Sequence, residues 1–177
     1  MDIEKLKYPI GKFSHSGEIS EQDLQRWIDE IEALPGLLRK AIKNLIPSQL
    51  DTPYRPDGWT LRQVVHHISD SHLNGMIRFK WALTEETPTI KPYFEERWAE
   101  LPDYKFLQVE LSLDFLELLH KRWVTLLRAL NRNDFSREFI HPESGRTDLA
   151  SYLGLYAWHG KHHLTHITNL LESKGWV

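Results

Sequence analysis

The sequence predicts an all-α protein, a four-helix bundle with long connections and an irregular N-terminal arm. Three observations support this prediction: apolar residues recur at helical spacing over four long segments, capping residues stand at the start of three of them, and proline-containing stretches separate most of them. The chain has 177 residues, of which 41% are hydrophobic, and this suits one sizeable core. We therefore expect a single domain over residues 1–177.

The N-terminal quarter of the chain is expected to hold the arm and the first long helix. Residues 1–19 show no sustained hydrophobic period, so they are expected to lie irregularly on the surface of the domain. Ser20 is a good helix cap, and apolar residues then recur at helical spacing toward residue 47. Residues 47–59 contain three prolines and predict a loop.

The second helix is predicted to begin after Thr60 and to reach Thr84. Thr60 and Gln63 form a capping box, in which each side chain bonds the backbone of the other residue. The stretch 87–103 also carries three prolines and is long for a simple spacer. We expect this stretch to cover part of the bundle.

The remaining two helices are predicted on either side of a turn. A third helix is expected over residues 106–130, with an apolar stripe that includes Leu111, Phe115, Leu118, Leu119, Trp123, Leu126, Leu127 and Leu130. Residues 139–146 predict a tight turn or small hairpin, and Asp148 begins a fourth helix that reaches about Ser173. Because two connections are long, the bundle is expected to contain crossovers.

The composition excludes several classes of function. With 22 basic and 25 acidic side chains, the chain has no general attraction to nucleic acid or to an anionic membrane. We see no signal peptide, no apolar stretch of about 20 residues and no glycine-rich phosphate loop, so a soluble cytoplasmic protein without membrane contact is expected. The absence of cysteine leaves histidine and carboxylates as metal ligands, and ten histidines are present.

Three of these histidines share one face of the fourth helix. At about 100 degrees per residue, His159, His163 and His166 all fall on its apolar stripe. His159 and His163 are four residues apart, a spacing that lets two imidazoles bind one metal ion. The alternative for each is a core histidine bonded to a tyrosine or a carbonyl. His166 could be a third ligand, a partner of a ligand or a proton carrier, and His162 is expected to be a polar residue at the edge of the stripe.

The second helix holds the third expected ligand. Its histidines are His66, His67 and His72, and the helical spacing places His67 beside the apolar stripe, on a polar ridge with Ser71, Asn74 and Arg78. His66 falls on the far side with Asp70, whereas His72 lies near the centre of the stripe and could be a core histidine. Spacing therefore favours His67, although a solvated helix flank would look the same.

Several motifs across nearly the whole chain resemble a known family, the DinB-like metal-binding bundles, and within it the YfiT-type metal-dependent hydrolases. These motifs are Tyr-Pro-Ile-Gly at 8–11, Asp-Thr-Pro-Tyr-Arg at 51–55, Gly-Trp-Thr-Leu-Arg-Gln-Val-Val-His-His at 58–67, Leu-Thr-Glu-Glu-Thr-Pro at 83–88, Arg-Trp at 122–123, Gly-Leu-Tyr-Ala-Trp-His at 154–159 and Lys-His-His-Leu-Thr-His-Ile-Thr at 161–168. The resemblance implies a DinB-like four-helix bundle.

The resemblance also implies the metal site. In that family a histidine eight residues after a tryptophan and two histidines of the fourth helix bind zinc or nickel. Counting eight residues from Trp59 gives His67, and the fourth-helix pair corresponds to His159 and His163. One Zn²⁺ per subunit, with Ni²⁺ as the alternative, is therefore expected. Many relatives carry glutamine at the position of His166.

Three functions follow as competing expectations. The first is metal-dependent hydrolysis of a small-molecule substrate, with His166 or Asp70 as the catalytic acid or base. The second, which the resemblance suggests, is S-transfer from a low-molecular-weight thiol such as bacillithiol. In that reaction Arg62, Arg78 and Arg122 are candidates to bind an anionic cosubstrate, or else they form salt bridges. The third is a non-enzymatic metal-stabilised bundle. Seven tryptophans leave apolar surface for a homodimer under all three.

Overall fold

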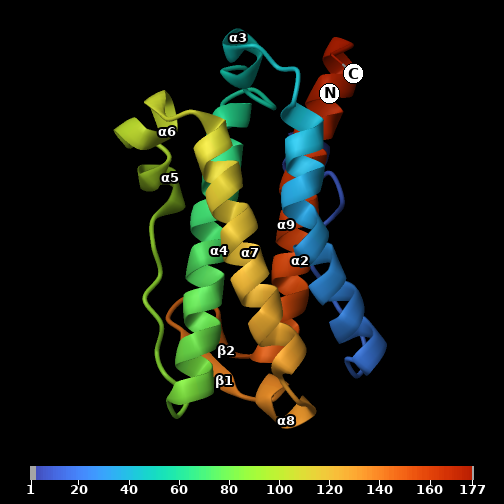
Figure 1. Cartoon of the computed structure of the whole chain (residues 1–177), viewed down its shortest axis with the longest axis vertical. Coiled ribbons are helices and arrows are strands. Elements are labelled where there is room, and N and C mark those ends of the chain that lie inside the picture. The colour runs from blue at the N-terminus through green and yellow to red at the C-terminus, as the bar shows by residue number, and fades with distance from the viewer. Residues whose placement is uncertain (1–2, 177) are drawn as a thin grey trace.

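The computed structural model describes residues 3–176 and confirms the all-α bundle (Figure 1). Long helices form its body, and a small hairpin closes one end. The long helices are α2 (Glu21–Ile42), α4 (Leu61–Thr84), α7 (Val109–Ala129) and α9 (Leu149–Lys174). Within the described residues no helix has both the length and the apolar composition needed to cross a bilayer.

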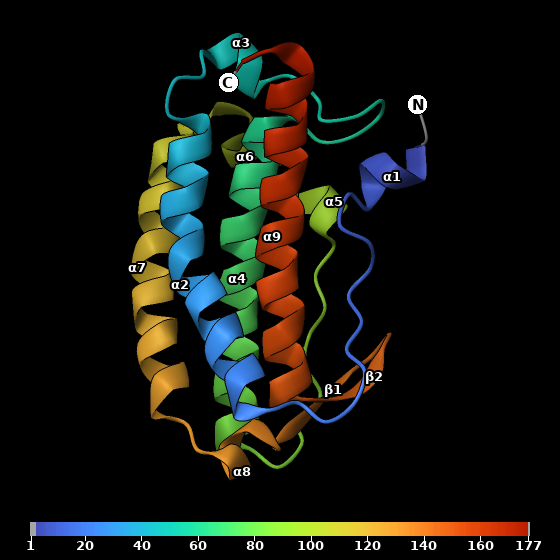
Figure 2. The same cartoon turned by 90° about the vertical axis from the view of Figure 1, so that its right-hand side faces the viewer.

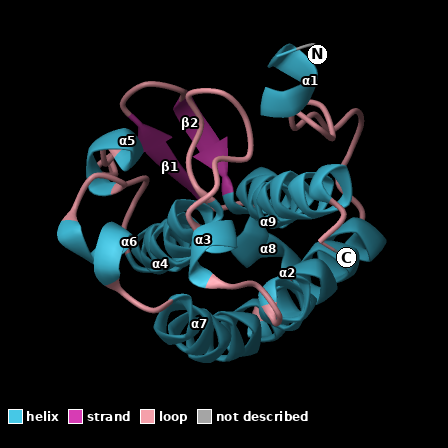
Figure 3. Ribbon diagram, turned by 90° about the horizontal axis from the view of Figure 1, so that it is seen from above, coloured by secondary structure: helices cyan, strands magenta, loops and turns pink. Residues whose placement is uncertain are grey.

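The order of the helices around the bundle differs from their order in the chain. Helix α2 packs on α7 and α9, and α4 packs on the same two helices, so α2 and α4 lie diagonally across the core (Figure 3). In Figure 1, α2 and α9 run upward whereas α4 and α7 run downward. The expected crossovers are therefore present, and they place α4 and α9 side by side.

Shorter elements occupy the connections. They are α1 (Ile3–Lys7), α3 (Pro47–Leu50), α5 (Glu95–Trp98), α6 (Pro102–Phe106), α8 (Arg132–Phe135), β1 (Glu138–His141) and β2 (Gly145–Asp148). The two strands pair in antiparallel register, which confirms the expected hairpin. The N-terminal arm is irregular except for α1, and the first two residues of the expected arm lie outside the described part. Figure 2 shows the arm running beside α9.

Capping side chains begin the long helices where the sequence places them. Ser20 and Asp23 form a capping box at α2, and Thr60 and Gln63 form the expected box at α4. The carboxylate of Asp148 accepts a hydrogen bond from the backbone N–H of Ser151 at the start of α9. These contacts satisfy N–H groups that a helix leaves free, and they fix the position at which each helix begins.

The apolar stripe predicted for α7 is partly wrong. Leu111 is 53% exposed and Leu118 is 63% exposed, whereas the neighbouring face is buried. That buried face carries Val109, Leu113, Leu116, Leu119, His120, Trp123, Val124 and Leu127. Helix α7 has apolar residues on two adjacent faces, and the hydrophobic period alone did not identify which face α2 and α4 cover.

Two glycines allow the long helices to approach closely. A Cβ atom at Gly75 of α4 would lie 2.6 Å from the ring of Tyr156 in α9 and 2.8 Å from the ring of Trp123 in α7. A Cβ atom at Gly160 would lie 2.5 Å from the side chain of Leu34 in α2. Glycine at these positions therefore lets α9 pack against both α4 and α2.

Candidate metal centre

Three histidines converge where α4 and α9 meet. One nitrogen each from His67, His159 and His163 lies within 4.8 Å of the others. The Nε2 atoms of His67 and His159 are 3.2 Å apart. Two nitrogens bonded to one tetrahedral zinc ion lie on the order of 3.3 Å apart, so this spacing fits a shared ion. The structure thus brings together all three residues that the sequence singled out.

A chain of buried hydrogen bonds backs His159. Its Nδ1 lies 3.3 Å from Nε2 of His72, and Nδ1 of His72 lies 2.9 Å from Nε2 of His120. Nδ1 of His120 lies 2.6 Å from the carbonyl oxygen of Ile31. A carbonyl can only accept, so His120 carries its proton on Nδ1. His72 and then His159 must also donate from Nδ1, and Nε2 of His159 keeps a free lone pair that faces the site.

A shorter chain of the same kind backs His163. Nε2 of His166 donates to the carbonyl oxygen of Lys7 in α1 at 3.1 Å. Nδ1 of His166 then accepts from Nδ1 of His163 at 3.4 Å. This leaves Nε2 of His163 unprotonated. We call the chain through His72 and His120 the core relay, and the chain through His166 to Lys7 the arm relay.

The imidazoles of the site are neutral at physiological pH. Burial lowers the pKa of His67 to about 3, with a further contribution from His162. Burial is also the main cause that lowers the pKa of His159 and His163 well below the usual value. A metal ion would therefore displace few protons on binding near pH 7. The donor set, three neutral imidazoles without thiolate or carboxylate, suits zinc or nickel.

The histidines open onto a cavity of about 460 Å³. All three line it, together with Trp59, whose ring centroid is 4.6 Å from that of His67. Further parts of the wall come from α4 and α9, from the connection before α5, which supplies Tyr93, and from the hairpin, which supplies His141. The expectation that residues 87–103 cover part of the bundle is therefore confirmed, and what they cover is this cavity.

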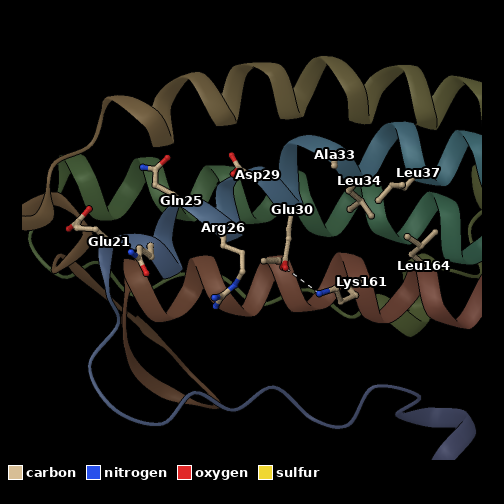
Figure 4. Close-up of a pocket in the computed structure, with 12 residues that line it drawn as sticks. Glu21, Gln25, Arg26, Asp29, Glu30, Ala33, Leu34, Leu37, Lys161 and Leu164 are labelled. Carbon is tan, nitrogen blue, oxygen red and sulfur yellow. Dashed lines mark hydrogen bonds and ion pairs between the residues drawn. The ribbon is translucent and has the colours of Figure 1, made fainter.

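A larger hollow of about 650 Å³ lies elsewhere, between α2 and α9 (Figure 4). Its wall contains no histidine, and it carries an ion pair of Glu30 with Lys161 at 3.2 Å. Its carboxylates belong to no group of three converging ligand atoms among the described residues. The larger of the two hollows is therefore not the one that the three histidines line.

The two predicted catalytic residues lie outside the cavity wall. His166 sits behind His163, with both ring nitrogens bonded and its ring stacked on Tyr54 at 4.0 Å. Asp70 accepts a hydrogen bond from the hydroxyl of Tyr104 at 2.6 Å, and burial raises its pKa. Their catalytic roles stay predictions. The position of His166 fits its alternative role as the partner of a ligand, and His166 also forms with His162 and His163 a second group whose nitrogens lie within 4.8 Å of one another, so its role as a ligand stays a prediction too.

The other histidines of these helices are more buried than the sequence suggested. His162 is 7% exposed and stacks on Trp158, so its expected place on a polar flank is wrong. His66 faces away from the site as expected, but it is buried and its Nδ1 lies 2.7 Å from the hydroxyl of Ser112. His72 is a core histidine, as one alternative held.

The three predicted arginines have different environments. Arg62 pairs with Asp51 at 2.7 Å, which is the salt bridge that the alternative reading expected. Arg122 is exposed on α7. Arg78 is buried and lines the same cavity as the three histidines.

His120 is the functional residue that sequence reasoning missed. It lies on the buried face of α7, one turn from Leu116 and Trp123. The signal was present, because a histidine at helical spacing between apolar residues must find a buried partner. The apolar stripe predicted for α7 lies on the adjacent face, so the prediction does not include His120.

A helical bundle whose cavity is lined by three convergent neutral imidazoles defines a class of protein, the helical metal-binding bundles. Residues 30–167 match the family model of the DinB superfamily, and the chain belongs to this family. A protein of Bacillus mycoides named "Putative metal-dependent hydrolase" is 59% identical over 98% of this chain and 100% of its own length. A Bacillus cereus protein of the same name is 60% identical over the same shares.

Solved structures give the same result for the fold. YfiT from Bacillus subtilis, described as a probable metal-dependent hydrolase with an unusual four-helix bundle topology, superposes with a TM-score of 0.95 at 48% identity. That match covers 98% of this chain and 99% of YfiT. The four-helix bundle protein TT2238 superposes with a TM-score of 0.58 at 20% identity over 82% of this chain and 98% of its own, which supports the fold alone.

Proposed function

We propose that the protein is a metal-dependent hydrolase of a small-molecule substrate, in which His67, His159 and His163 hold one zinc ion, or nickel in its place. The observation that carries this proposal is the convergence of three neutral imidazoles on a cavity. Three protein ligands leave one coordination position for water or substrate, which is typical of catalytic zinc sites. The names of the relatives agree with this assignment.

The side chains around the site position the imidazoles, shield them from solvent and fix their tautomers. A metal ion bound by these residues would supply Lewis acidity, which would ease deprotonation of a water molecule near pH 7. The core relay and the arm relay keep the lone pairs of His159 and His163 directed at the site. Trp59 packs against His67 and excludes solvent on that side. The titratable groups that line the cavity apart from the imidazole ligands include His141, Glu95 and Glu143.

Thiol transfer is the second function that the site supports. It would use the same open position to hold a thiolate, because a bound metal ion keeps a thiol deprotonated. The observation that favours it is Arg78, a buried cation in the cavity that could bind an anionic cosubstrate. A metal-stabilised bundle without catalysis is the third.

Metal stoichiometry tests the site itself. The purified protein is loaded with zinc, dialysed against a weak chelator and measured by elemental analysis. We expect one zinc per chain for the natural sequence, and less than one tenth of that for His163→Ala. His15→Ala is the matched control, because His15 is exposed on the N-terminal arm. If His163→Ala keeps a full equivalent while circular dichroism shows an intact bundle, the ligand assignment is wrong.

Activity panels then separate the three functions. The zinc and nickel forms are offered esters, amides and phosphoesters in one panel, and a thiol with an electrophile in the other. Hydrolysis that is lost on chelation supports the proposal. Turnover only in the thiol panel would replace hydrolysis by transfer, and no turnover in either panel would favour the metal-stabilised bundle.

A further inference from the structure

Arg78 is a buried cation without an acidic partner. Its side chain lies on α4, three turns after His67, and it is 7% exposed. The guanidinium donates to the hydroxyl of Tyr152 at 2.7 Å and to the carbonyl oxygen of Lys91 at 3.4 Å. Within residues 3–176 it forms no ion pair with a carboxylate. Arg62, on the same helix, instead pairs with Asp51.

This arrangement is costly unless something binds there. A buried charge is stable in a protein when it is paired or fully hydrogen-bonded. A guanidinium has five N–H donors, and the structure gives Arg78 two acceptors. Arg78 lines the cavity, so an acceptor from a bound molecule can approach its guanidinium.

The neighbouring hydroxyls cannot neutralise the charge. Tyr152 accepts from Arg78 and donates to the hydroxyl of Tyr156 at 3.3 Å, and Tyr156 donates to the carbonyl oxygen of Ser71 at 2.9 Å. The hydroxyl groups of Tyr152 and Tyr156 therefore both donate their hydrogen atoms to other acceptors and carry no negative charge that could balance Arg78. Glu95 and Glu143 also line the cavity, but both side chains are exposed and neither pairs with the guanidinium.

We propose that Arg78 binds a carboxylate of the substrate, at the end of the cavity remote from the three histidines. This inference rests on the proposed metal site and adds the class of substrate: an elongated molecule with an anionic end. The planar fork of a guanidinium matches the two oxygens of a carboxylate. A cavity of about 460 Å³ suits a small molecule.

The helix gives the length of that molecule. Residues 67 and 78 are eleven positions apart, which places them on one face of α4 and about 16 Å apart along its axis. Helical side chains lean toward the N-terminus, so the long side chain of Arg78 extends back toward His67, whereas the shorter side chain of His67 leans away from it. We therefore expect on the order of 10 to 15 Å between the reacting group at the metal and the carboxylate.

A series of dicarboxylates measures this distance. Linear α,ω-dicarboxylates of increasing length, and monocarboxylates of the same lengths, are titrated into the zinc-loaded protein by calorimetry. One carboxylate can occupy the open metal position while the other reaches Arg78. We expect the dicarboxylate affinity to peak at one length and to exceed that of the matched monocarboxylate by about 10-fold or more there, far above the statistical factor of two.

Three variants test whether Arg78 causes the higher affinity for the dicarboxylate. Arg78→Gln should reduce the advantage of the dicarboxylate to about the statistical factor, and Arg78→Lys, which keeps the charge but loses the fork, should retain part of it. Arg62→Gln is the control and should behave as the natural sequence. Circular dichroism and zinc content are recorded for each variant, so Arg78→Lys still tests the proposal if Arg78→Gln does not fold.

The outcomes separate this inference from the proposed function. Equal affinity of mono- and dicarboxylates at every length, with zinc bound, would overturn the role of Arg78 and leave the metal site intact. An advantage that depends on Arg78 but persists in metal-free protein would support the carboxylate site and count against the open metal position. An advantage unchanged in both Arg78 variants would also overturn the proposal.

Discussion

The two α9 histidines of the metal centre are held by different parts of the molecule. The core relay behind His159 crosses the bundle through His72 and His120, which are 0% and 2% exposed, and ends on α2. The arm relay behind His163 passes through His166 and ends on α1, a five-residue helix with no buried side chain. One ligand is therefore oriented by the fold itself, and the other by a segment that lies on its surface.

Mutations in the two relays should therefore separate a change in stability from a change in metal affinity, two effects that often coincide. A change in the core relay removes hydrogen bonds from the centre of the bundle, so we expect it to alter both the free energy of unfolding and the metal affinity. A change in the arm relay removes one bond inside the bundle and one at the partly exposed arm, so we expect it to alter the metal affinity with a smaller change in the free energy of unfolding. The predictions below test this contrast.

Acid should give the largest effect, and His120 of the core relay should contribute part of it alongside the other buried histidines. Burial lowers the pKa of His120 to about 4, whereas an unfolded histidine titrates near 6.5. The unfolded chain therefore gains a proton first, so stability is fully present above pH 6.5 and falls as the pH drops toward 4. His120 alone accounts for roughly 3 kcal/mol over that range. Urea unfolding of metal-free protein at several pH values measures this loss.

The variant His120→Leu tests how much of the loss of stability in acid comes from His120. This variant lacks one buried imidazole, so its stability should fall less steeply between pH 6.5 and 4, by about one proton's worth of slope. His15→Ala, on the exposed arm, should keep the natural slope. A natural protein whose unfolding free energy is the same at pH 7 and pH 4.5 would contradict the neutral, buried state of the relay.

At pH 7, the effect of His120→Leu should be smaller than that of acid. It should nevertheless change both the free energy of unfolding and the zinc affinity. The carbonyl oxygen of Ile31 and Nδ1 of His72 each lose a partner, which costs about 1 to 3 kcal/mol of stability. Loss of the relay should also weaken zinc binding by about 10-fold to 100-fold. Denaturation and a competition titration with a zinc-binding dye measure the two. Unchanged zinc affinity would show that the core relay does not orient His159.

Changes at His166 should give the smallest effect. His166→Leu should weaken zinc binding by about 10-fold and lower the unfolding free energy by about 1 kcal/mol, less than His120→Leu, because only one of the two bonds that it breaks is fully buried. His166→Gln is the matched control. A glutamine amide can accept from His163 and donate to Lys7, so this variant should bind zinc nearly as tightly as the natural sequence. A large loss of stability in His166→Leu would remove the contrast between the relays.

The four helices and the three converging histidines were predictable because each depends on local information. Capping residues mark where α2 and α4 begin, and an i, i+4 pair such as His159 and His163 faces one way whatever surrounds it. His67 needed the resemblance to a known family in addition, because spacing alone also allowed a solvated flank.

The relays and the buried state of His162 were not predictable, because they depend on contacts between distant parts of the chain. The period of α7 shows two adjacent apolar faces, and only the packing of α2 and α4 decides that His120 is inside and Leu118 is outside. His162 lies under the N-terminal arm, near the ring of Tyr8. No pattern within one helix contains that information.

The absence of a side chain at Gly75 has a consequence for the geometry of the candidate metal centre. The ring of Tyr156 occupies the space that a methyl group would fill, and Tyr156 stands one turn before His159 on α9. The distance between α4 and α9 is therefore set by direct contact of a ring with a backbone. A methyl group added at residue 75 would increase the distance between α4 and α9. Because α4 carries one of the three candidate ligands and α9 carries the other two, this added distance would also separate His67 from His159 and His163, although Gly75 lies two turns away from His67.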